Sequence, residues 1–310
     1  MIPYGALPMK PTPKQKILVI LGPTASGKTS LAVALAQMFG GEVISADSRQ
    51  VYRGLDIGTE KITEEEMAGI PHHLIDCVDP ETIYTAFDFK KDAAMQSEAI
   101  ASRGHLPIIA GGTLFYTETL LGRRNAAQVP PNSELRAELE KLSTEALFNK
   151  LQEIDPRRAE AIDAHNPRRL VRALEIAHAL GAVPEEAIAE CPYDAYIIGL
   201  SVPAETLRER IAKRLRETLQ KGLVEETQIL LKKGIPAERL MEIGLEYRVV
   251  LSYLNGEFEE NLLEQKLIDK VWQYAKRQRT WLKRIEGVTW YEVDEREKIA
   301  TDVRKFLEEE

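Results

Sequence analysis

Residues 16–36, KILVILGPTASGKTSLAVALA, decide the fold class of this chain. The continuous apolar run at 16–21 is typical of a strand buried on both faces, and a helical pattern follows over 29–39. Between the two, four residues match the pattern G-x-x-x-x-G-K-[ST] in the strand, loop and helix context that it requires: Gly22, Gly27, Lys28 and Thr29. The stretch therefore predicts a phosphate-binding loop (P-loop) in an α/β protein.

The chemistry of such a loop is binding of phosphate oxygens. Successive backbone N–H groups and the N-terminus of the following helix surround a di- or triphosphate. Lys28 adds a positive charge, and the hydroxyl of Thr29 can hold Mg²⁺. Because the loop recognises phosphate oxygens only, any molecule with a diphosphate in the right place could occupy it.

The rest of the chain continues the alternation of strand and helix. Apolar runs predict further strands at residues 42–47, 72–78, 106–112, 195–202 and 288–293. Helical patterns are expected at 88–102 and from about Asp294 to the end of the chain. The alternation favours a parallel sheet flanked by helices, with a P-loop NTPase-like order of elements.

Strand signals vanish between about residues 122 and 192, where three segments have helical patterns. The last of them, NPRRLVRALEIAHALG, has Asn166 as N-cap, Pro167 at the first helical position and Gly181 as the stop. We therefore expect an all-helical insertion at 123–193. The core domain would comprise residues 1–122 and 194–310, the second part carrying long C-terminal helices.

Composition limits the function classes. The chain has 310 residues, 44% hydrophobic and 29% charged, which is the profile of a globular protein. Its formal net charge of −8 argues against indiscriminate nucleic-acid binding but allows a local basic patch. No segment approaches the roughly 20 apolar residues that span a membrane, and residues 1–16 are expected to be a loose leader rather than a signal peptide.

Cys77 and Cys191 form neither a C-x-x-C pair nor a disulfide framework, so a reducing cytoplasm is the expected location. We expect both cysteines to be small buried hydrophobic residues. A metal site at His72 and His73 is not favoured, because adjacent residues of a strand point to opposite faces and no third ligand has suitable spacing.

Polar residues follow two of the predicted strands. Asp47 ends EVISAD, and Thr113 follows IIAGG. The carboxyl ends of parallel strands line the ligand crevice of such sheets, so both residues are expected near the P-loop. Asp47 could be a general base, a Mg²⁺ ligand through water, or only a helix cap, and the residues alone leave these roles open.

Two segments are strongly basic. AKRQRTWLKR (275–284) carries five basic residues and no acidic one, with Gln278 inside the apolar stripe of the helix, where its amide needs a partner. NPRRLVR (166–172) places Arg168 and Arg172 on one helical face with Arg169 beside them. Each could be an ordinary solvated face, but two such patches in an acidic chain favour a bound polynucleotide.

The ordered set of motifs GPTASGKT, ISADSRQVYRGLDIGTEK, PHHLID, IIAGGT, NPRRLVRALE and KRQRTWL resembles the tRNA dimethylallyltransferase family, from about Ile17 to about Trp290. The resemblance implies transfer of a dimethylallyl group from dimethylallyl diphosphate to N6 of the adenosine immediately 3′ of the anticodon, with release of diphosphate. It implies Mg²⁺ as cofactor and the tRNA anticodon stem-loop as partner; we expect a monomer.

The resemblance also implies roles for individual residues. Asp47 would accept the proton of the attacking amine, with Lys28 and Thr29 as further catalytic residues and Thr29 at Mg²⁺. The substrate diphosphate would be held by Gly22, Thr24, Ala25, Ser26, Gly27, Lys28, Thr29 and Arg248. Contacts to tRNA are expected from Asp47, Ser48, Arg49, Gln50, Thr113, Arg136, Arg168, Arg169, Arg172, Lys276, Arg277, Gln278, Arg279 and Trp281. The chain departs from the common family form in reading IGLEYR where many members read IGYK or VGYR.

Three other functions share parts of this pattern. A small-molecule kinase has a P-loop followed by an acidic strand end, and an adenylate prenyltransferase performs the same chemistry on a free nucleotide. A non-catalytic RNA-binding module would need neither the P-loop nor Asp47. The two basic segments favour tRNA as the acceptor, with the target base flipped into a channel between the sheet and the insertion.

Overall fold

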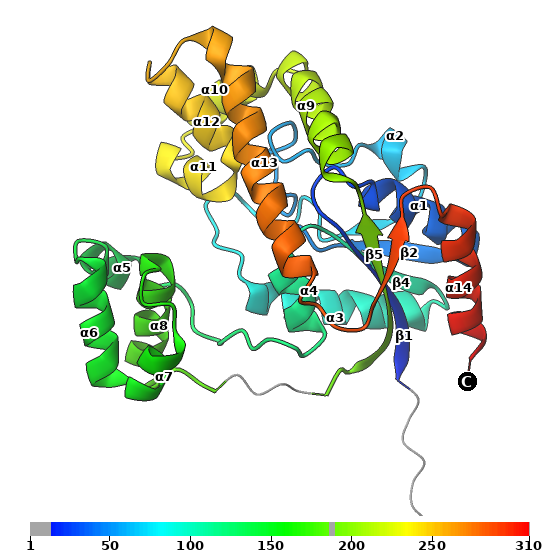
Figure 1. Ribbon diagram of the computed structural model, residues 1–310, viewed down its shortest axis with the longest axis horizontal. Helices are drawn as coiled ribbons and strands as arrows, with labels where there is room; N and C mark the ends of the chain where they lie inside the picture. The colour runs from blue at the N-terminus through cyan, green and yellow to red at the C-terminus, as the bar shows by residue number, and fades with distance from the viewer. Residues whose placement is uncertain (1–13, 186–189, 310) are drawn as a thin grey trace, which may run out of the picture.

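The computed structural model describes residues 14–185 and 190–309, so most of the expected leader and the segment 186–189 lie outside the described residues. The described chain contains a six-stranded, wholly parallel sheet in the order β3-β2-β4-β1-β5-β6. The strands are β1 (Gln15–Leu21), β2 (Gly41–Ser45), β3 (His72–His73), β4 (Leu106–Ala110), β5 (Tyr193–Ser201) and β6 (Val288–Glu292). The predicted parallel α/β sheet with flanking helices is confirmed (Figure 1).

The helices fall into three groups. Those around the sheet are α1 (Lys28–Phe39), α2 (Glu64–Met67), α3 (Ala86–Ser102), α4 (Leu114–Leu120) and α14 (Arg296–Glu308). Those between β4 and β5 are α5 (Ser133–Leu139), α6 (Thr144–Ile154), α7 (Pro156–Ala161) and α8 (Pro167–Leu180). Those between β5 and β6 are α9 (Ala204–Gln220), α10 (Leu223–Lys232), α11 (Ala237–Ile243), α12 (Leu245–Leu254), the 3₁₀ turn η1 (Glu260–Leu262) and α13 (Leu263–Leu282).

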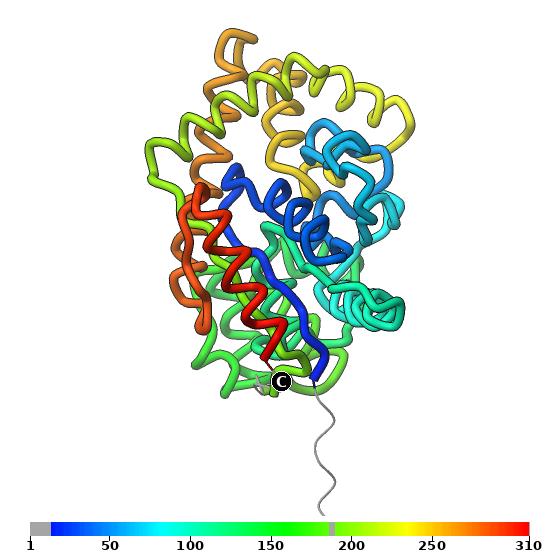
Figure 2. The backbone as a smooth tube through the Cα atoms, turned by 90° about the vertical axis from the view of Figure 1, so that its right-hand side faces the viewer, coloured from blue at the N-terminus to red at the C-terminus, as the bar shows by residue number. Residues whose placement is uncertain are grey.

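The sheet buries both of its faces, as continuous apolar strands require. Alternate residues of β1 enter different cores, since successive side chains of a strand point to opposite faces. Ile17 and Val19 pack with α3 and α4, whereas Leu18 and Ile20 pack with α1 and α14. The first strand and the last helix meet on the second face, where the Lys16 ammonium donates to the Phe306 carbonyl at 2.8 Å; α14 runs beside β1 in Figure 2.

Helices α5–α8 have a hydrophobic core of their own, built around Leu147, Leu151, Leu170 and Leu174. They form a separate lobe at the lower left of Figure 1. The boundaries of α8 follow the predicted caps: Asn166 accepts from the Arg169 N–H at 3.2 Å, and Gly181 is left-handed at φ 84°.

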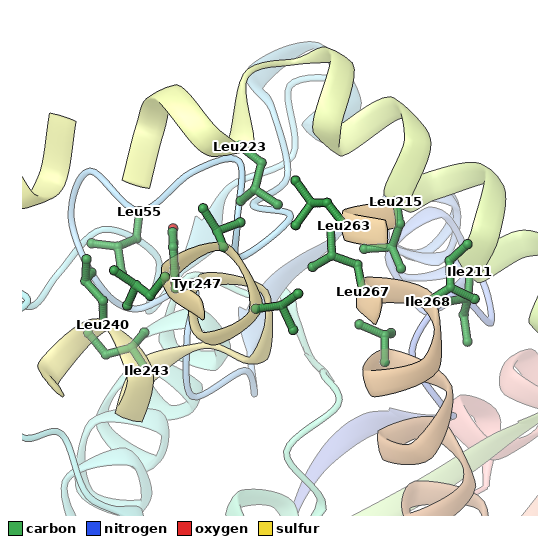
Figure 3. Packing of buried hydrophobic residues seen from close by; sticks show 14 of the residues in the cluster. Leu55, Ile211, Leu215, Leu223, Leu240, Ile243, Tyr247, Leu263, Leu267 and Ile268 are labelled. Atoms are coloured by element: carbon green, nitrogen blue, oxygen red, sulfur yellow. The ribbon is translucent and has the colours of Figure 1, made fainter. Parts of the chain in front are cut away.

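Helices α9–α13 form a third core above the carboxyl edge of the sheet. Leu215 of α9, Leu223 of α10, Tyr247 of α12 and Leu267 of α13 meet there, as Figure 3 shows. Leu55, from the loop that follows β2, is fully buried in the same cluster. This core fixes α9 and α13 next to the P-loop edge of the sheet.

Three details differ from the sequence-based expectations. The strand expected at 72–78 ends at His73, because Leu74 and Asp76 adopt positive φ values of 60° and 51°. Helix α7 was not predicted, although Asp155 caps it and Pro156 occupies its first turn. Cys77 is exposed rather than buried, since it lies on the loop after this shortened strand.

Other sequence-based expectations concern membranes and metals. In the described ranges no helix is both long enough and apolar enough to cross a bilayer. Within the same ranges no cluster of His, Cys, Asp and Glu side chains has the arrangement of a metal site. The imidazole of His73 instead contacts the buried Glu42 carboxylate at 2.7 Å.

Candidate active site

The P-loop lies between the end of β1 and the start of α1 and lines a cavity of about 560 Å³. Residues 24–29 contribute to its wall. Two of them need left-handed backbone: Gly27 has φ 89° and Ala25 has φ 60°. A Cβ at Gly22 would lie 2.5 Å from the Ser26 hydroxyl, which explains why glycine is required there. The loop is therefore shaped by close packing as well as by its backbone angles.

Ser26 supplies an observation that points to a ligand. Its side chain is fully buried in the loop, and its hydroxyl has no hydrogen-bond partner among the described residues. Buried hydroxyls in folded proteins are nearly always paired. An anion in the cavity would accept this hydrogen bond together with those of the loop amides.

Lys28 is held at the mouth of the loop. Its ammonium donates to the Pro23 carbonyl at 2.8 Å. Burial lowers its pKa to about 8, and the nearby Arg214 adds to this effect, while Asp47 and Glu60 oppose it. A phosphate in the cavity would favour the charged form, because it brings negative charge to the ammonium.

Asp47 also lines this cavity and is the second residue after the end of β2. Its Oδ1 accepts the backbone N–H of Arg49 at 2.9 Å and that of Gln50 at a longer 3.4 Å. These two contacts leave Oδ2 toward the cavity; the Cβ of an alanine at Gly112 would lie 3.9 Å from it. One oxygen is thus held by the backbone and the other faces the space where a substrate would sit.

The end of β4 packs against the end of β2. The Ser48 N–H donates to the Thr113 hydroxyl at 2.9 Å, and the Thr113 N–H donates to the Ala46 carbonyl at 3.1 Å. Gly111 lies so close to Ala46 that any Cβ would overlap its carbonyl group. The structure therefore brings Thr113 to the strand-end crevice, where its hydroxyl contacts the residue after Asp47.

Gln278 of α13 also lines the P-loop cavity. Its side-chain oxygen accepts the Thr24 N–H at 2.9 Å, and its side-chain nitrogen donates to the Gly112 carbonyl at 2.9 Å. Only 4% of the residue is exposed. The amide predicted to need a partner inside the apolar stripe of this helix therefore joins the P-loop to the end of β4.

Arg248 is not where the sequence-based prediction placed it. Its guanidinium donates to the Met241 carbonyl at 2.6 Å, and it does not line the cavity. The reason is the direction in which the side chains of α12 point. Glu246 pairs with Arg49, and a residue two positions further along a helix points about 200° away. The structure therefore places Arg248 outside the cavity in which the diphosphate is expected to bind.

Arg210 and Arg214 of α9 do line the P-loop cavity, and the sequence analysis named neither. Arg214 donates to the Thr24 hydroxyl at 2.7 Å and lies 2.5 Å from the Glu60 carboxylate. Burial raises the pKa of Glu60, while the arginine opposes this shift. The i, i+4 spacing of the two arginines on an amphipathic helix was an available signal, but it could not show which end of the sheet the helix covers.

A second cavity of about 970 Å³ lies between the helical insertion and the sheet domain. Its wall carries eight basic residues and one acidic residue, Glu118; the basic residues are Arg124, Arg136, Arg158, Arg169, Arg172, Lys276, Arg277 and Arg284. Phe115 and Trp281 add aromatic surface, with ring centroids 6.4 Å apart. We call this cavity the basic cleft.

The structure brings only some of the predicted tRNA-contacting residues to the basic cleft. Arg136, Arg169, Arg172, Lys276, Arg277 and Trp281 line it. Asp47, Arg49, Gln50 and Gln278 line the P-loop cavity instead, and Ser48, Thr113, Arg168 and Arg279 line neither. Arg168 is exposed on α8, outside the cleft.

Two of the cleft arginines are oriented by one buried acid. Glu175 accepts from Arg136 at 2.8 Å and from Arg172 at 3.2 Å. Burial alone would raise the pKa of Glu175, but the hydrogen bond from Arg136 and the neighbouring donors lower it. The carboxylate therefore stays ionised and fixes both guanidinium groups at the cleft wall.

Helix α13 contributes residues to the walls of both cavities. Tyr274 and Gln278 line the P-loop cavity, while Arg277 and Trp281 line the basic cleft. A parallel sheet with a P-loop after β1, a carboxylate after β2 on the far side of β4, and a basic cleft one helix away defines a P-loop enzyme that acts on a polyanion.

Comparison with known proteins identifies the family. A family model described as IPP transferase matches residues 50–285, and the chain belongs to that family. The tRNA dimethylallyltransferase of Thermomicrobium roseum is 41% identical over 306 residues, covering 96% of this chain and 93% of the relative. The tRNA dimethylallyltransferase 1 of Geotalea uraniireducens is 43% identical over 282 residues, covering 90% and 93%.

Solved structures agree with this assignment. The full-length tRNA isopentenylpyrophosphate transferase of Bacillus halodurans superimposes with a TM-score of 0.72 at 37% identity, over 95% of this chain and 97% of its own. A eukaryotic dimethylallyltransferase acting on tRNA superimposes with a TM-score of 0.77 at 29% identity, over 94% and 77%.

Proposed function

We propose that this protein transfers a dimethylallyl group from dimethylallyl diphosphate to N6 of the adenosine immediately 3′ of the anticodon in tRNA, releasing diphosphate. The observation that carries the proposal is the pairing of the P-loop with Asp47 across one cavity of about 560 Å³. The names of its relatives support prenylation of tRNA as the activity.

In this proposal the P-loop holds the diphosphate as a leaving group. Cleavage of the carbon–oxygen bond builds negative charge on the diphosphate, and preorganised donors stabilise such charge most as it develops. The loop amides, the unpaired Ser26 hydroxyl and Lys28 would supply those donors. Arg214, which already contacts Thr24, would take the role expected of Arg248.

Magnesium fits the donor groups of this cavity. The hydroxyl of Thr29 lines it, and a hard oxygen ligand of this kind suits Mg²⁺. When bound, the ion would neutralise charge on the diphosphate.

Asp47 acts as the general base. The amine nitrogen attacks C1 of the donor, the C1–oxygen bond breaks with its electron pair going to the diphosphate, and the amine proton passes to the free Oδ2 of Asp47. An exocyclic adenine amine is a poor nucleophile, so its positioning and deprotonation are worth about 10² to 10⁴ in rate. Gln278 and Gly112 lie beside this oxygen and would border the incoming base.

The basic cleft is the proposed tRNA site. Its arginines and lysine suit phosphodiester oxygens, while Phe115 and Trp281 offer surface for unstacked bases. The anticodon stem-loop would lie between the insertion and α13, and the target adenosine would be flipped past α13 into the P-loop cavity. We further propose that the enzyme works as a monomer in the cytoplasm.

The kinase and the adenylate prenyltransferase are not favoured as alternatives. A small-molecule kinase or an adenylate prenyltransferase would have no use for the basic cleft, and the family relatives are tRNA-modifying enzymes. The test combines purified protein, Mg²⁺, dimethylallyl diphosphate and unmodified tRNA with adenosine 3′ of the anticodon. Mass spectrometry of the digested tRNA is expected to show a prenylated adenosine, absent when guanosine replaces that adenosine. Prenylation of free AMP, or consumption of ATP without tRNA, would overturn the proposal.

A further inference from the structure

An ion pair between Arg49 and Glu246 lies next to Asp47. Arg49 donates from Nη1 to the Glu246 carboxylate at 2.6 Å, and its Nε lies 3.9 Å from Asp47 Oδ1. The side chain of Arg49 is 15% exposed and that of Glu246 is 2% exposed. Arg49 therefore spans the gap between a buried acid of α12 and the carboxylate that ends β2, instead of reaching into solvent.

The charge of Arg49 depends on the two carboxylates beside it, those of Glu246 and Asp47. Burial by itself lowers the pKa of the Arg49 guanidinium, but the carboxylates of Glu246 and Asp47 outweigh it and raise the pKa above its ordinary value. Removing one member of a buried pair leaves the other uncompensated, which is costly. Asp47 thus sits next to a fixed positive charge whose direction is set by Glu246.

We propose that Arg49 and Glu246 are a positioning pair that holds Asp47 with one oxygen toward the protein and the other toward the substrate amine. The inference rests on the proposed function. It gives Arg49 a role in supporting Asp47 in place of the expected contact with tRNA. The backbone N–H of Arg49 holds Oδ1, and its side chain places positive charge on that same side of the carboxylate. The outer oxygen Oδ2 is left for the proton.

Glu246 has a distinct part in this arrangement. It holds the charged end of Arg49 at 2.6 Å, whereas the nearest approach of that side chain to Asp47 is 3.9 Å. Without Glu246 the guanidinium is free to turn and bind both oxygens of Asp47, a geometry that Arg favours with carboxylates. A base engaged in that way could not accept the amine proton.

The experiment measures single-turnover prenylation with saturating dimethylallyl diphosphate and tRNA, for Arg49→Met, Glu246→Gln and the reversed pair Arg49→Glu/Glu246→Arg. We expect the rate constant to fall about tenfold to a hundredfold in each, while tRNA affinity stays within about twofold of the wild type. Arg53 lies on the same loop as Arg49 and forms an exposed ion pair with Asp79. Arg53→Met is therefore the matched control and should leave the rate constant unchanged.

The rate constant and the melting temperature separate a positioning role from a structural one. Partial loss of folded protein lowers the concentration of active enzyme but not the rate constant of the bound complex, because both substrates are saturating. In the reversed pair we expect the melting temperature to recover relative to the two single variants, with the rate constant still low, because a carboxylate then faces Asp47.

Three outcomes would overturn the inference. These are an unchanged rate constant in Glu246→Gln, full recovery of the rate in the reversed pair, or a tenfold loss of tRNA affinity in Arg49→Met. A wild-type protein that makes no prenylated adenosine would instead overturn the proposed function.

Discussion

The side chain of Gln278 binds the main chain of Thr24: the amide oxygen accepts the Thr24 N–H at 2.9 Å across 254 positions of sequence. Because the same amide donates to Gly112, one buried residue of α13 fixes the P-loop relative to the end of β4. Helix α13 also lines the basic cleft, so this amide lies where the two cavities adjoin.

Gln278→Leu is expected to loosen the P-loop and to raise the KM for dimethylallyl diphosphate about tenfold. The substitution leaves the Thr24 N–H and the Gly112 carbonyl without partners, at a cost of about 1 to 3 kcal/mol for each buried group. Steady-state kinetics with tRNA held at saturation measures the change. Gln265→Leu, on the exposed face of the same helix, is the control. An unaltered KM in Gln278→Leu would show that the bridge has no part in donor binding.

Lys28 should make diphosphate affinity depend on pH. In the free protein its pKa is lowered to about 8, whereas bound diphosphate favours the ammonium form, so binding requires uptake of a proton above pH 8. Affinity is expected to be flat below pH 8 and to fall above it, by up to about tenfold per pH unit. Calorimetric titration of diphosphate between pH 7 and 10 measures this profile, and Lys28→Met should bind weakly with no such fall. A wild-type affinity that is flat to pH 10 contradicts the assignment.

The same group affects stability with a definite sign. Unfolded Lys28 keeps its proton up to the ordinary pKa of 10.5, but the folded protein releases it near pH 8. The unfolded state therefore binds more protons in this window, and the Lys28 contribution to the free energy of unfolding rises with pH from about 8 to 10.5. We measure urea unfolding of the wild type and of Lys28→Met at pH 8 and pH 10. The unfolding free energy of the wild type minus that of Lys28→Met should be larger at pH 10 than at pH 8. A difference that stays constant would contradict the lowered pKa.

Glu226→Gln is expected to destabilise the loop that carries Glu60. The Glu226 carboxylate accepts the backbone N–H groups of Asp56, Ile57 and Gly58 at 2.9, 2.7 and 2.8 Å. An amide has one acceptor oxygen and would turn its NH₂ group toward donors, so we expect a loss of about 3 kcal/mol in unfolding free energy. Hydrogen exchange of these three amides locates the effect, with the exposed Glu225→Gln as control. Unchanged amide protection would argue against this loop anchor.

Charge removal in the basic cleft should alter the salt dependence of tRNA binding. Arg169→Ala and Lys276→Ala each remove a cation that lines the cleft, so each is expected to weaken binding and to reduce the slope of log K against log salt by about 1. Arg168→Ala, on the exposed face outside the cleft, should have the smaller effect. Filter binding from 50 to 200 mM salt, roughly the range over which such slopes are resolved, measures the slopes. Lys150→Ala on α6 is the control, and equal slopes in all variants would place the tRNA elsewhere.

Local signals carried the sequence-based predictions that the structure confirms. The P-loop strand and helix are encoded within a few neighbouring residues, and the ends of α8 follow from Asn166 and Gly181. The rule that parallel strands share their carboxyl edge predicted that Thr113 could reach the same crevice as Asp47, and in the structure its hydroxyl contacts Ser48, the residue after Asp47.

Contacts between residues far apart in the chain could not be predicted from the sequence. The contacts of Arg214 with Thr24 and of Arg49 with Glu246 join segments 190 and 197 residues apart, and no local pattern shows which charge meets which. Arg248 was misplaced for a related reason, because the direction of its side chain depends on where α12 packs rather than on the motif around it. The buried acid Glu246 lies two residues away and pairs with Arg49, which lines the cavity.

The central claim is that the P-loop binds a diphosphate that leaves through carbon–oxygen cleavage. Its most direct test uses dimethylallyl diphosphate with ¹⁸O at the bridge between C1 and phosphorus, incubated with the protein, Mg²⁺ and unmodified tRNA. We predict one prenylated adenosine per diphosphate released, with all of the ¹⁸O in the diphosphate. Label that stays with the prenyl fragment, or a phosphorylated product in place of prenylated tRNA, would contradict the account.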